Sequence, residues 1–540
     1  MAGVLTEAFS AQGASEPQFA IEAHIDSFKY TSTEKSDAVQ APILNTADLA
    51  LHDVHLCIKR GSLTVLTGLS GCGKTTLLRL ICRLYPDFFE GRLQGNVRVL
   101  GRDTHDYAPG EMAACLGLVF QDPRSQFLST TVEDEIALTG ENLGIEREEL
   151  QKRVEQILAF LGITHLKNRS VLELSGGERQ KVAIASVLVS QPDVIVMDEP
   201  SASLDYASTL QLAQMLVKLK QAGKTIIVAE HRLFYLTHIL DQLVVMQEGT
   251  VEGVYGPEQL HQDLAQRLHL RAFDEKSLIA QVAAPATPML ATHAQMQIVA
   301  QTTQSVDAVP AIGVSREFVR RLDVFVQHHF WKRTQLMQDV GFDLLQSQVL
   351  AVVGSNGVGK STLAKQLCGL IPANTSLVTS WGNNGRTRNA ASFYVMQEAA
   401  NQIFFESVEE ELLQGRRDKR SCERAAYLLK KIDLWEQRLE HPQMLSGGEQ
   451  QRLVVGAALM EPHKLIVFDE PTAGLDYKRM SCLAELIAVC AQTSAVMVIT
   501  HDTELIMKAC THCLLCSEHD THMVAVSGNE QRIHAFMAGA

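Results

Sequence analysis

The sequence predicts an α/β protein in which one domain is present twice. Two glycine-rich motifs with the pattern G-x-x-x-x-G-K-[ST] begin at Gly68 and Gly354. Two Leu-Ser-Gly-Gly-Glu motifs follow them in the same order, at residues 174–178 and 445–449. Each copy also alternates short Val- and Ile-rich runs with amphipathic stretches, which is the pattern of strands alternating with helices. Motifs that recur in one order along a chain indicate a duplicated domain.

The length and composition agree with two globular domains. A chain of 540 residues is too long for one ordinary domain, and 46% hydrophobic and 20% charged residues are typical values. The formal net charge of −14 argues against nucleic acid as the main partner, because phosphate binding depends on Lys and Arg. The sequence contains neither an apolar run of ~18 residues that could span a membrane nor a secretory signal. The 11 cysteines lack paired spacing in most of the chain, which favours a reducing compartment.

The boundaries of the two copies follow from composition and from motif spacing. The stretch between the copies is rich in Ala, Gln, Thr and Pro and has no periodicity, which is typical of a linker. Ser446 follows Lys360 more closely than Ser175 follows Lys74, so a shortened peripheral subdomain is expected in the second copy. The expected parts are a tail at 1–20, a first domain at 21–265, a linker at 266–315 and a second domain at 316–540.

The glycine-rich motifs are expected to bind phosphate groups. Each follows an apolar strand and opens a helix, so backbone N–H groups can surround the phosphates and the helix N-terminus adds partial positive charge. Lys74 and Lys360 would reach phosphate oxygens, while Thr75 and Ser361 would bind Mg²⁺. The residues of these loops expected to bind ATP are Gly68, Ser70, Gly71, Gly73, Lys74, Thr75 and Thr76 in the first copy, and Gly354, Asn356, Gly357, Gly359, Lys360, Ser361 and Thr362 in the second.

An apolar strand in each copy ends in a pair of carboxylates. Four apolar residues precede Asp198-Glu199 and Asp469-Glu470, so each pair is expected at the C-terminal edge of a buried parallel sheet, where ligands bind. Asp198 and Asp469 are expected to hold Mg²⁺. Glu199 and Glu470 are expected to polarise the water that attacks ATP.

The Leu-Ser-Gly-Gly-Glu motif, placed between phosphate loop and acidic strand, resembles the signature of ATP-binding-cassette (ABC) proteins. The resemblance covers the chain except the N-terminal tail and the linker. It implies two P-loop NTPase domains, each with a RecA-like α/β core, an antiparallel β subdomain and an α-helical subdomain that carries the signature. It further implies that the chain is an ATP hydrolase that uses ATP and Mg²⁺.

The same resemblance implies that the two cassettes form an intramolecular head-to-tail dimer. Ser175 with Gly177, and Ser446 with Gly448, would then complete the ATP site of the other cassette, since glycine permits close approach and the serine hydroxyl can bond the γ-phosphate. One site would combine Lys74, Asp198, Glu199 and His231 with Ser446. The other would combine Lys360, Asp469, Glu470 and His501 with Ser175.

Further positions match the family pattern. Gln121 and Gln397 resemble the glutamines that sense Mg²⁺ and the attacking water. His231 and His501, each at the end of an apolar strand, resemble the histidine that contacts the γ-phosphate. No residue change marks either ATP site as degenerate.

Two other family positions are matched with different clarity. Asp205 and Asp476 resemble aspartates that link the two ATP sites across the dimer. Tyr30 resembles the aromatic residue that stacks on adenine in the first copy. The alignment of residues 328–331 in the second copy is loose. The sequence therefore leaves open which aromatic side chain of this stretch stacks on adenine there.

The segments at 120–127 and 131–136 favour one class of ABC machine. They resemble the ATPases of energy-coupling-factor importers, in which a Gln-bearing segment lines the groove for a coupling helix of the membrane subunit. Residues 401–404 and 407–412 repeat the pattern. The resemblance implies a peripheral motor on the cytoplasmic face of the membrane, with integral membrane subunits and a small membrane protein that binds a vitamin, a vitamin precursor or a transition-metal ion.

Two alternatives remain from the sequence. The nearer one is the fused ATPase of another ABC importer, of the sugar type. The other is a soluble ABC protein that acts on ribosomes or DNA, against which stand the acidic charge and the absence of a charged helical linker.

A cysteine-rich segment near the C-terminus requires an interpretation of its own. The spacing of Cys510, Cys513 and Cys516 would admit zinc or an iron–sulfur centre. The repeat aligns Cys513 and Cys516 with Leu243 and Met246 of the first copy. We therefore expect these two cysteines to be buried apolar residues of a strand.

Overall fold

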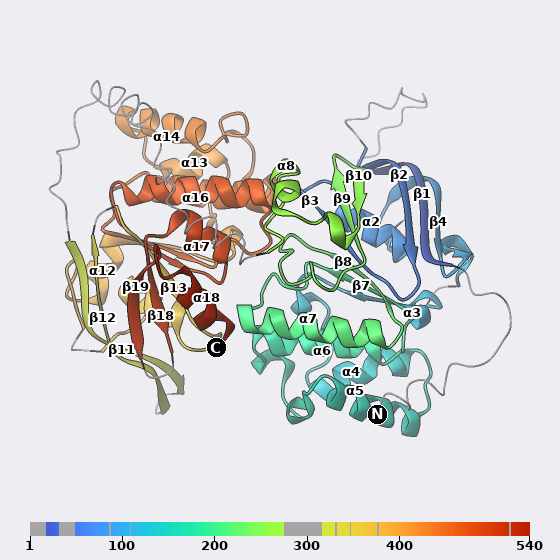
Figure 1. Ribbon diagram of the computed structural model, residues 1–540. Helices are drawn as coiled ribbons and strands as arrows, with labels where there is room; N and C mark the ends of the chain where they lie inside the picture. Colours follow the sequence, from blue (N-terminus) through green and yellow to red (C-terminus); the bar gives the residue numbers. More distant parts are fainter. Residues whose placement is uncertain are drawn as a thin grey trace. The chain divides into compact units, whose positions relative to one another are not determined.

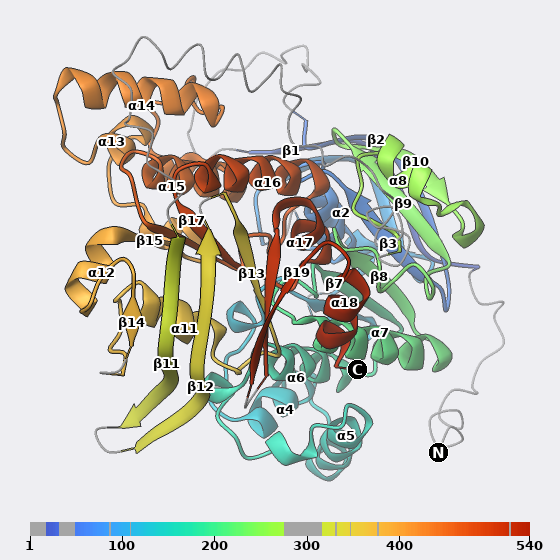
Figure 2. The same ribbon diagram turned by 60° about the vertical axis from the view of Figure 1, so that its left-hand side comes forward.

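The computed structural model divides the chain into two compact units, with the boundary after Asp274. Most of the expected tail and linker, residues 1–17 and 275–315, lies outside the residues that the structure describes. Figures 1 and 2 show the elements of each unit in two views. The described residues are 18–31, 49–85, 88–108, 110–274, 316–329, 332–345, 347–374, 377–517 and 520–539.

A six-stranded sheet forms the centre of the first unit, in the order β10-β9-β3-β8-β7-β6. All strands but β10 run parallel, and β10 pairs antiparallel with β9. Because parallel strands end at one edge, the residues that follow β3, β6, β7 and β8 come together there. The strands are β3 (Leu63–Gly68), β6 (Leu116–Val119), β7 (Val194–Asp198), β8 (Thr225–Ala229), β9 (Gln242–Gln247) and β10 (Thr250–Tyr255).

Strand β7 illustrates how both faces of this sheet are buried. Val194 and Val196 pack into one hydrophobic cluster, whereas Ile195 and Met197 pack into a second cluster on the opposite face. Successive side chains of a strand point to opposite faces, so a run of apolar residues can serve two layers at once. This double burial explains why the sequence of the strand is apolar throughout.

An antiparallel sheet and a group of helices cover the two faces of the core sheet (Figure 1). The antiparallel sheet, in the order β2-β1-β4-β5, and helix α2 share one cluster with the core sheet, and α4 to α7 share the other. The antiparallel strands are β1 (Phe19–Tyr30), β2 (Leu51–Lys59), β4 (Gly91–Val99) and β5 (Arg102–Asp103). The helices are α2 (Lys74–Ile81), α3 (Met112–Cys115), α4 (Val132–Asn142), α5 (Arg147–Phe160), α6 (Gly176–Leu188), α7 (Tyr206–Gln221) and α8 (Gln262–Arg267).

The second unit repeats this architecture. Its core sheet has the order β15-β16-β17-β13-β18-β19, which matches the first sheet strand for strand. The strands are β13 (Val349–Val353), β15 (Ser392–Val395), β16 (Leu465–Asp469), β17 (Ala495–Ile499), β18 (His512–Cys516) and β19 (Thr521–Ala525). The helices are α11 (Lys360–Leu367), α12 (Gly385–Ala391), α13 (Val408–Leu413), α14 (Lys419–Lys431), α15 (Gly447–Ala458), α16 (Tyr477–Ala491), α17 (Thr503–Ala509) and α18 (Glu530–Ala538).

The shortening of the second copy falls in two places. Its antiparallel sheet consists of the long hairpin β11 (Arg316–His329) and β12 (Lys332–Leu345), visible in Figure 2, and a two-residue strand β14 (Val378–Thr379). Helix α13 is shorter than its counterpart α4, and it ends where Gln414 adopts a left-handed conformation with φ 50°. Both units keep an α/β core, an antiparallel sheet and a helical subdomain, so the predicted fold class is confirmed.

No helix in the described part of the chain is both long enough and apolar enough to span a membrane.

Candidate functional site

The loop between β3 and α2 has the shape of a phosphate cradle. Gly73 precedes the helix in a left-handed conformation with φ 99°, and a Cβ there would lie 2.6 Å from a methyl group of Leu51. Gly359 has the same conformation before α11, with φ 110°, and a Cβ there would lie 2.9 Å from Leu336. Only glycine meets both demands without strain. Backbone geometry therefore explains why glycine precedes the lysine in each motif.

The lysines of the two motifs lie folded along their own loops. The Nζ atom of Lys74 donates to the carbonyl oxygens of Gly68 at 3.0 Å and Leu69 at 3.1 Å. Lys360 Nζ donates to the equivalent carbonyls of Gly354 and Ser355, at 2.8 and 3.0 Å. Both lysines are buried. Each ammonium group is thus held inside the loop, where it can attract a phosphate group.

The hydroxyl group after each lysine meets the aspartate of the neighbouring strand. Thr75 Oγ1 lies 3.3 Å from Asp198 Oδ1, and Ser361 Oγ lies 3.0 Å from Asp469 Oδ1. Burial, followed by the charge of Glu199, raises the pKa of Asp198 to about 6. A bound cation would favour the ionised form of this carboxyl. The hydroxyl and carboxylate oxygens form the hard donor set that suits Mg²⁺.

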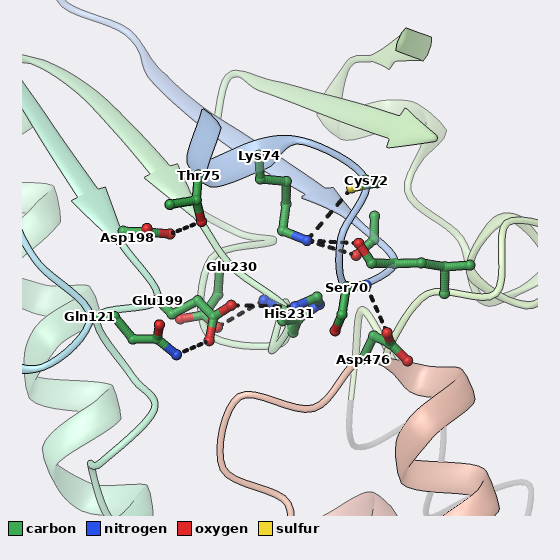
Figure 3. A network of polar contacts seen from close by, with 12 residues as sticks. Ser70, Cys72, Lys74, Thr75, Gln121, Asp198, Glu199, Glu230, His231 and Asp476 are labelled. Carbon is green, nitrogen blue, oxygen red and sulfur yellow. Dashed lines mark hydrogen bonds and ion pairs between the residues drawn. The ribbon is translucent and has the colours of Figure 1, made fainter. Parts of the chain in front are cut away.

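Glu199 lies at the centre of a cluster of polar side chains at the end of β7. Its carboxylate accepts a hydrogen bond from Gln121 Nε2 at 2.8 Å, and its other oxygen lies 3.4 Å from His231 Nε2. Figure 3 shows that the side chains of Gln121 and His231 both point to this carboxylate. The backbone of Glu199 has φ 43°, a left-handed conformation that is costly for a residue other than glycine.

The second unit reproduces this arrangement in part. His501 Nε2 lies 3.4 Å from Glu470 Oε1, and Glu470 has φ 47°. The backbone N–H groups of Glu199 and Glu470 bond to the carbonyls of Ala229 and Ile499, so the same turn is fixed in both units. Gln397 is exposed and lies two residues after the end of β15. The predicted glutamate, histidine and glutamine thus lie at one sheet edge in each unit.

Tyr30 is placed at the end of β1, close to helix α2. Its hydroxyl group contacts Thr76 Oγ1, and its ring packs edge-on against Phe28 and Tyr85. Tyr30 remains half-exposed. The side chains at 328–331, the candidates for the same role in the second copy, lie outside the described residues.

The signature serines begin helices in the helical subdomain of their own unit. Ser175 and Ser446 are the N-caps of α6 and α15, and each accepts from the backbone of a glutamate in a capping box, Glu178 or Glu449. In both units the serine hydroxyl also lies 2.7 Å from that glutamate's carboxylate. Asp205 caps α7 by accepting from the N–H group of Ser208 at 2.8 Å. These contacts order the motif that was predicted to meet ATP.

Comparison with known proteins identifies the family. The sequence profile described as ABC transporter matches residues 51–202 and 337–473, which together are more than half of the chain. The chain belongs to the ABC transporter family. It contains two fused ABC domains and is an ATP hydrolase that binds nucleotide.

Relatives of similar length support the assignment. A Treponema denticola protein, named as a candidate ABC transporter ATP-binding protein, is 36% identical over 490 residues. These are 88% of this chain and 93% of the relative. A candidate HMP/thiamine import ATP-binding protein of Bacillus subtilis is 30% identical over 484 residues, 87% of this chain and 86% of the relative.

One solved structure agrees with the fold over most of the chain, and a second resembles about half of it at a lower TM-score. A ribosome-bound archaeal ABCE1 protein covers 90% of this chain and 78% of its own, with 19% identity and a TM-score of 0.61. CbiO1 of Clostridium perfringens, part of an ABC transporter complex, is 27% identical and covers 49% of this chain and 100% of its own, with a TM-score of 0.40.

The cysteines of this ABC ATPase do not form a metal centre in the described residues. All 11 are free thiols, and the described part of the chain contains no group of three metal-ligating side chains. Cys513 and Cys516 are buried in β18, and burial raises the pKa of Cys516 to about 12. Thiols of this kind are inert apolar side chains, as the repeat predicted.

The sequence did not reveal a contact that distinguishes the second ABC domain. Tyr394 on β15 donates its hydroxyl hydrogen bond to Asp469 Oδ2, while Ser361 bonds to the other oxygen of this carboxylate. Burial, followed by the charge of Asp469, raises the pKa of Tyr394. Leu118 occupies the equivalent position of the first domain and cannot donate such a bond. The difference between the two copies was the only signal in the sequence.

Replacing Tyr394 with Phe is expected to destabilise the second unit by about 1.5–3 kcal/mol, because a buried carboxylate loses a hydrogen bond. The three tryptophans, Trp331, Trp381 and Trp435, all belong to the second half of the chain, so tryptophan fluorescence in a urea titration follows that unit alone. Tyr427→Phe, at an exposed tyrosine of the same unit, is the control. Equal midpoints for both variants would remove this contact from the account.

Proposed function

We propose that this ABC ATPase powers an importer of the energy-coupling-factor type through separate integral membrane subunits. The observation that carries the proposal is a pair of loops, residues 127–130 and 403–406. Each loop directly follows a glutamine, Gln126 or Gln402, and presents an exposed apolar side chain. We call these the docking loops. A membrane subunit would contact them through its coupling helices, together with a small membrane protein that binds a vitamin, a vitamin precursor or a transition-metal ion.

The docking loops expose large apolar side chains at matching positions. Leu128 is 82% exposed in the first unit, and Phe404 is 81% exposed in the second. Phe120 and Met396, which immediately precede the two glutamines, are also exposed. Matched apolar exposure in both copies is typical of an interaction surface, since isolated exposed apolar residues would not recur at equivalent positions.

A buried glutamate holds the backbone of each docking loop through hydrogen bonds. Glu135 Oε2 accepts from the N–H groups of Leu128 at 2.9 Å and Ser129 at 2.7 Å. Glu411 Oε2 accepts equivalently from the backbone of Phe404 and Phe405, at 2.9 and 3.0 Å. Charge-assisted bonds to backbone N–H groups are strong. The apolar side chain is therefore presented by a rigid loop, which favours docking of a preformed partner helix.

The glutamines of these segments turn inward. Gln126 Oε1 accepts from the N–H group of Phe120 at 3.2 Å, and Gln402 Oε1 accepts from that of Met396 at 2.6 Å. The side chain of Gln402 also donates to the carbonyl of Tyr394. Each glutamine thus ties its docking loop to the strand end that carries the catalytic glutamine. Movement of one would be transmitted to the other.

The B. subtilis relative supports the direction of transport. Its printed name assigns it to HMP/thiamine import, and the chain matches it over most of its length. On this basis the protein works at the cytoplasmic face of the cell membrane. Closing and opening of the two ABC domains would drive rocking of the membrane subunit.

The residues of the site have complementary roles in this proposal. The N–H groups of the phosphate loop and Lys74 bind the phosphates, and Glu199, oriented by Gln121 and His231, accepts the proton of the attacking water. Thr75 and Asp198 would hold Mg²⁺, which neutralises phosphate charge when bound. Equivalent roles fall to Lys360, Ser361, Gln397, Asp469, Glu470 and His501. Ser175 and Ser446 would each complete the site of the other domain, and Asp205 and Asp476 would link the two sites.

Replacing Leu128 and Phe404 with Ser in one chain is expected to weaken binding to native membranes at least about tenfold, because the loss of two apolar anchors that the partner would bury costs about 1.4 kcal/mol or more. Co-sedimentation with membranes from the source cells measures the effect. Phe88→Ser, at a phenylalanine that is 78% exposed beyond α2, is the control with matched exposure. Equal sedimentation of both variants would argue against docking at these loops.

A further inference from the structure

A buried glutamate, directly before His231 in the sequence, accepts four hydrogen bonds in the first unit. Glu230 follows strand β8 and is 2% exposed. Its Oε1 atom accepts from the N–H groups of His231 at 2.8 Å and Arg232 at 3.2 Å. Its Oε2 atom accepts from Tyr235 Oη at 2.8 Å and from the N–H group of Ser201 at 3.3 Å. Figure 3 shows Glu230 beside His231 and Glu199.

These bonds join two loops of the site. His231 and Arg232 belong to the loop after β8, and His231 Nε2 lies 3.4 Å from the carboxylate of Glu199. Ser201 belongs to the loop that starts at Glu199 and leads to Asp205, the N-cap of α7. A single carboxylate therefore holds the backbone of the histidine loop and the backbone of the glutamate loop at the same time.

The network satisfies the hydrogen-bonding requirements of a buried carboxyl group. A buried polar group is costly unless hydrogen-bond partners surround it. Three backbone N–H groups and one phenol are these partners here. The backbone of Glu230 is itself fixed, since its N–H group bonds to the carbonyl of Leu66 in β3. The carboxylate is thus anchored to the core sheet, and both loops are anchored to the carboxylate.

The second unit has other residues in place of Glu230 and of Tyr235, the side chain that bonds to it. Thr500 stands at the position of Glu230, and Leu505 stands at the position of Tyr235. Thr500 Oγ1 accepts only locally in the histidine loop, from the N–H group of Asp502 at 3.1 Å. Asp502 then caps helix α17 through the N–H group of Leu505. The chain after His501 is accordingly helical, whereas the chain after His231 forms irregular turns.

We propose that Glu230 is a positioning residue that holds His231 and the loop after Glu199 in their catalytic arrangement, and that the second ABC domain, with Thr500 at this position, lacks this carboxylate. The inference rests on the proposed roles of Glu199 and His231. Its consequence is that the two sites are preorganised differently. The site with Glu199 gains its arrangement from a fixed carboxylate, and the site with Glu470 has no carboxylate at that position.

Glu230→Gln tests the proposal, because the amide keeps the shape of the side chain but turns an NH₂ group toward N–H donors. Turnover is measured on the full chain in a Glu470→Gln background, so that hydrolysis reports the site with Glu199. We expect kcat to fall about tenfold, which corresponds to about 1.4 kcal/mol, while KM changes less than about twofold. Hydrogen exchange of the Ser201, His231 and Arg232 amides is expected to accelerate selectively.

Two further variants make the outcome decisive. Glu530→Gln removes another buried carboxylate that accepts a backbone bond, far from the site in its own unit, and kcat should stay within about twofold. Tyr235→Phe removes one donor and leaves the carboxylate in place, so a smaller fall in kcat with unchanged KM is expected, even if Glu230→Gln does not fold. An unchanged kcat in both site variants, or equal falls in Glu530→Gln, would overturn the proposal.

The same experiment separates this inference from the roles on which it rests. If Glu199→Gln abolishes turnover and Glu230→Gln does not change it, the positioning role fails and the catalytic assignment stands. If turnover survives Glu199→Gln, the catalytic assignment itself fails.

Discussion

Exchange of both Glu199 and Glu470 for glutamine is expected to lower ATP turnover by about 10²–10⁴-fold while ATP binding persists. The carboxylates lie at the end of their strands, where Gln121 and His231 orient the first and His501 contacts the second. Removal of a general base typically costs this factor. The lysines and phosphate loops are untouched, so two ATP molecules per chain should remain bound after rapid desalting.

Turnover is measured by phosphate release and retention by radiolabelled ATP. Glu258→Gln, an exposed acid after β10, is the control and should hydrolyse ATP at the original rate. If the double variant continued to turn over, these glutamates would not be the general bases, and the left-handed turns at φ 43° and 47° would require another explanation.

A second large effect is expected from pairing changes across the two domains. In the Glu199→Gln and Glu470→Gln background, Lys74→Ala with Ser446→Ala should damage one head-to-tail site twice and leave one ATP per chain. Lys74→Ala with Ser175→Ala should damage both sites and leave none. Loss of a buried charge partner costs about 2–5 kcal/mol, which is at least about 30-fold in affinity.

These two variants carry the same kinds of substitution in the same number, so each is the control of the other. Retained ATP is counted after desalting. The opposite pattern, with one ATP retained when Lys74 and Ser175 are changed together, would mean that each signature serves its own domain. The head-to-tail arrangement would then be wrong.

The sequence was sufficient to predict the parts of the fold that local patterns determine. Glycine loops, apolar strands and Asp-Glu pairs each depend on a short stretch of chain, and the structure brings Lys74, Asp198, Glu199 and His231 to one sheet edge because parallel strands end together. The shortening of the second copy was also detectable, since spacing between motifs needs no tertiary information. Its division between α13 and the antiparallel sheet was not.

Contacts that depend on strand pairing were beyond the sequence. Tyr394 stood only in an apolar run before Gln397, and its bond to Asp469 exists because β15 pairs with β16. Glu230 directly precedes His231 in the sequence, yet its network joins the end of β8 to the loop after Glu199. The inward turn of Gln126 likewise depends on the backbone of Phe120. In each case the informative signal was a difference or a match between the two copies.

The central claim, that this ABC ATPase drives a membrane importer, is tested most directly by affinity purification. The tagged full chain is isolated from detergent-solubilised membranes of its own cells, and mass spectrometry identifies the proteins that accompany it. The account predicts a mid-sized transmembrane subunit together with a small substrate-binding membrane protein, whose ligand would identify the substrate. Recovery of ribosomal or DNA-repair proteins with no membrane protein would contradict the claim, and the ATPase assignment would remain.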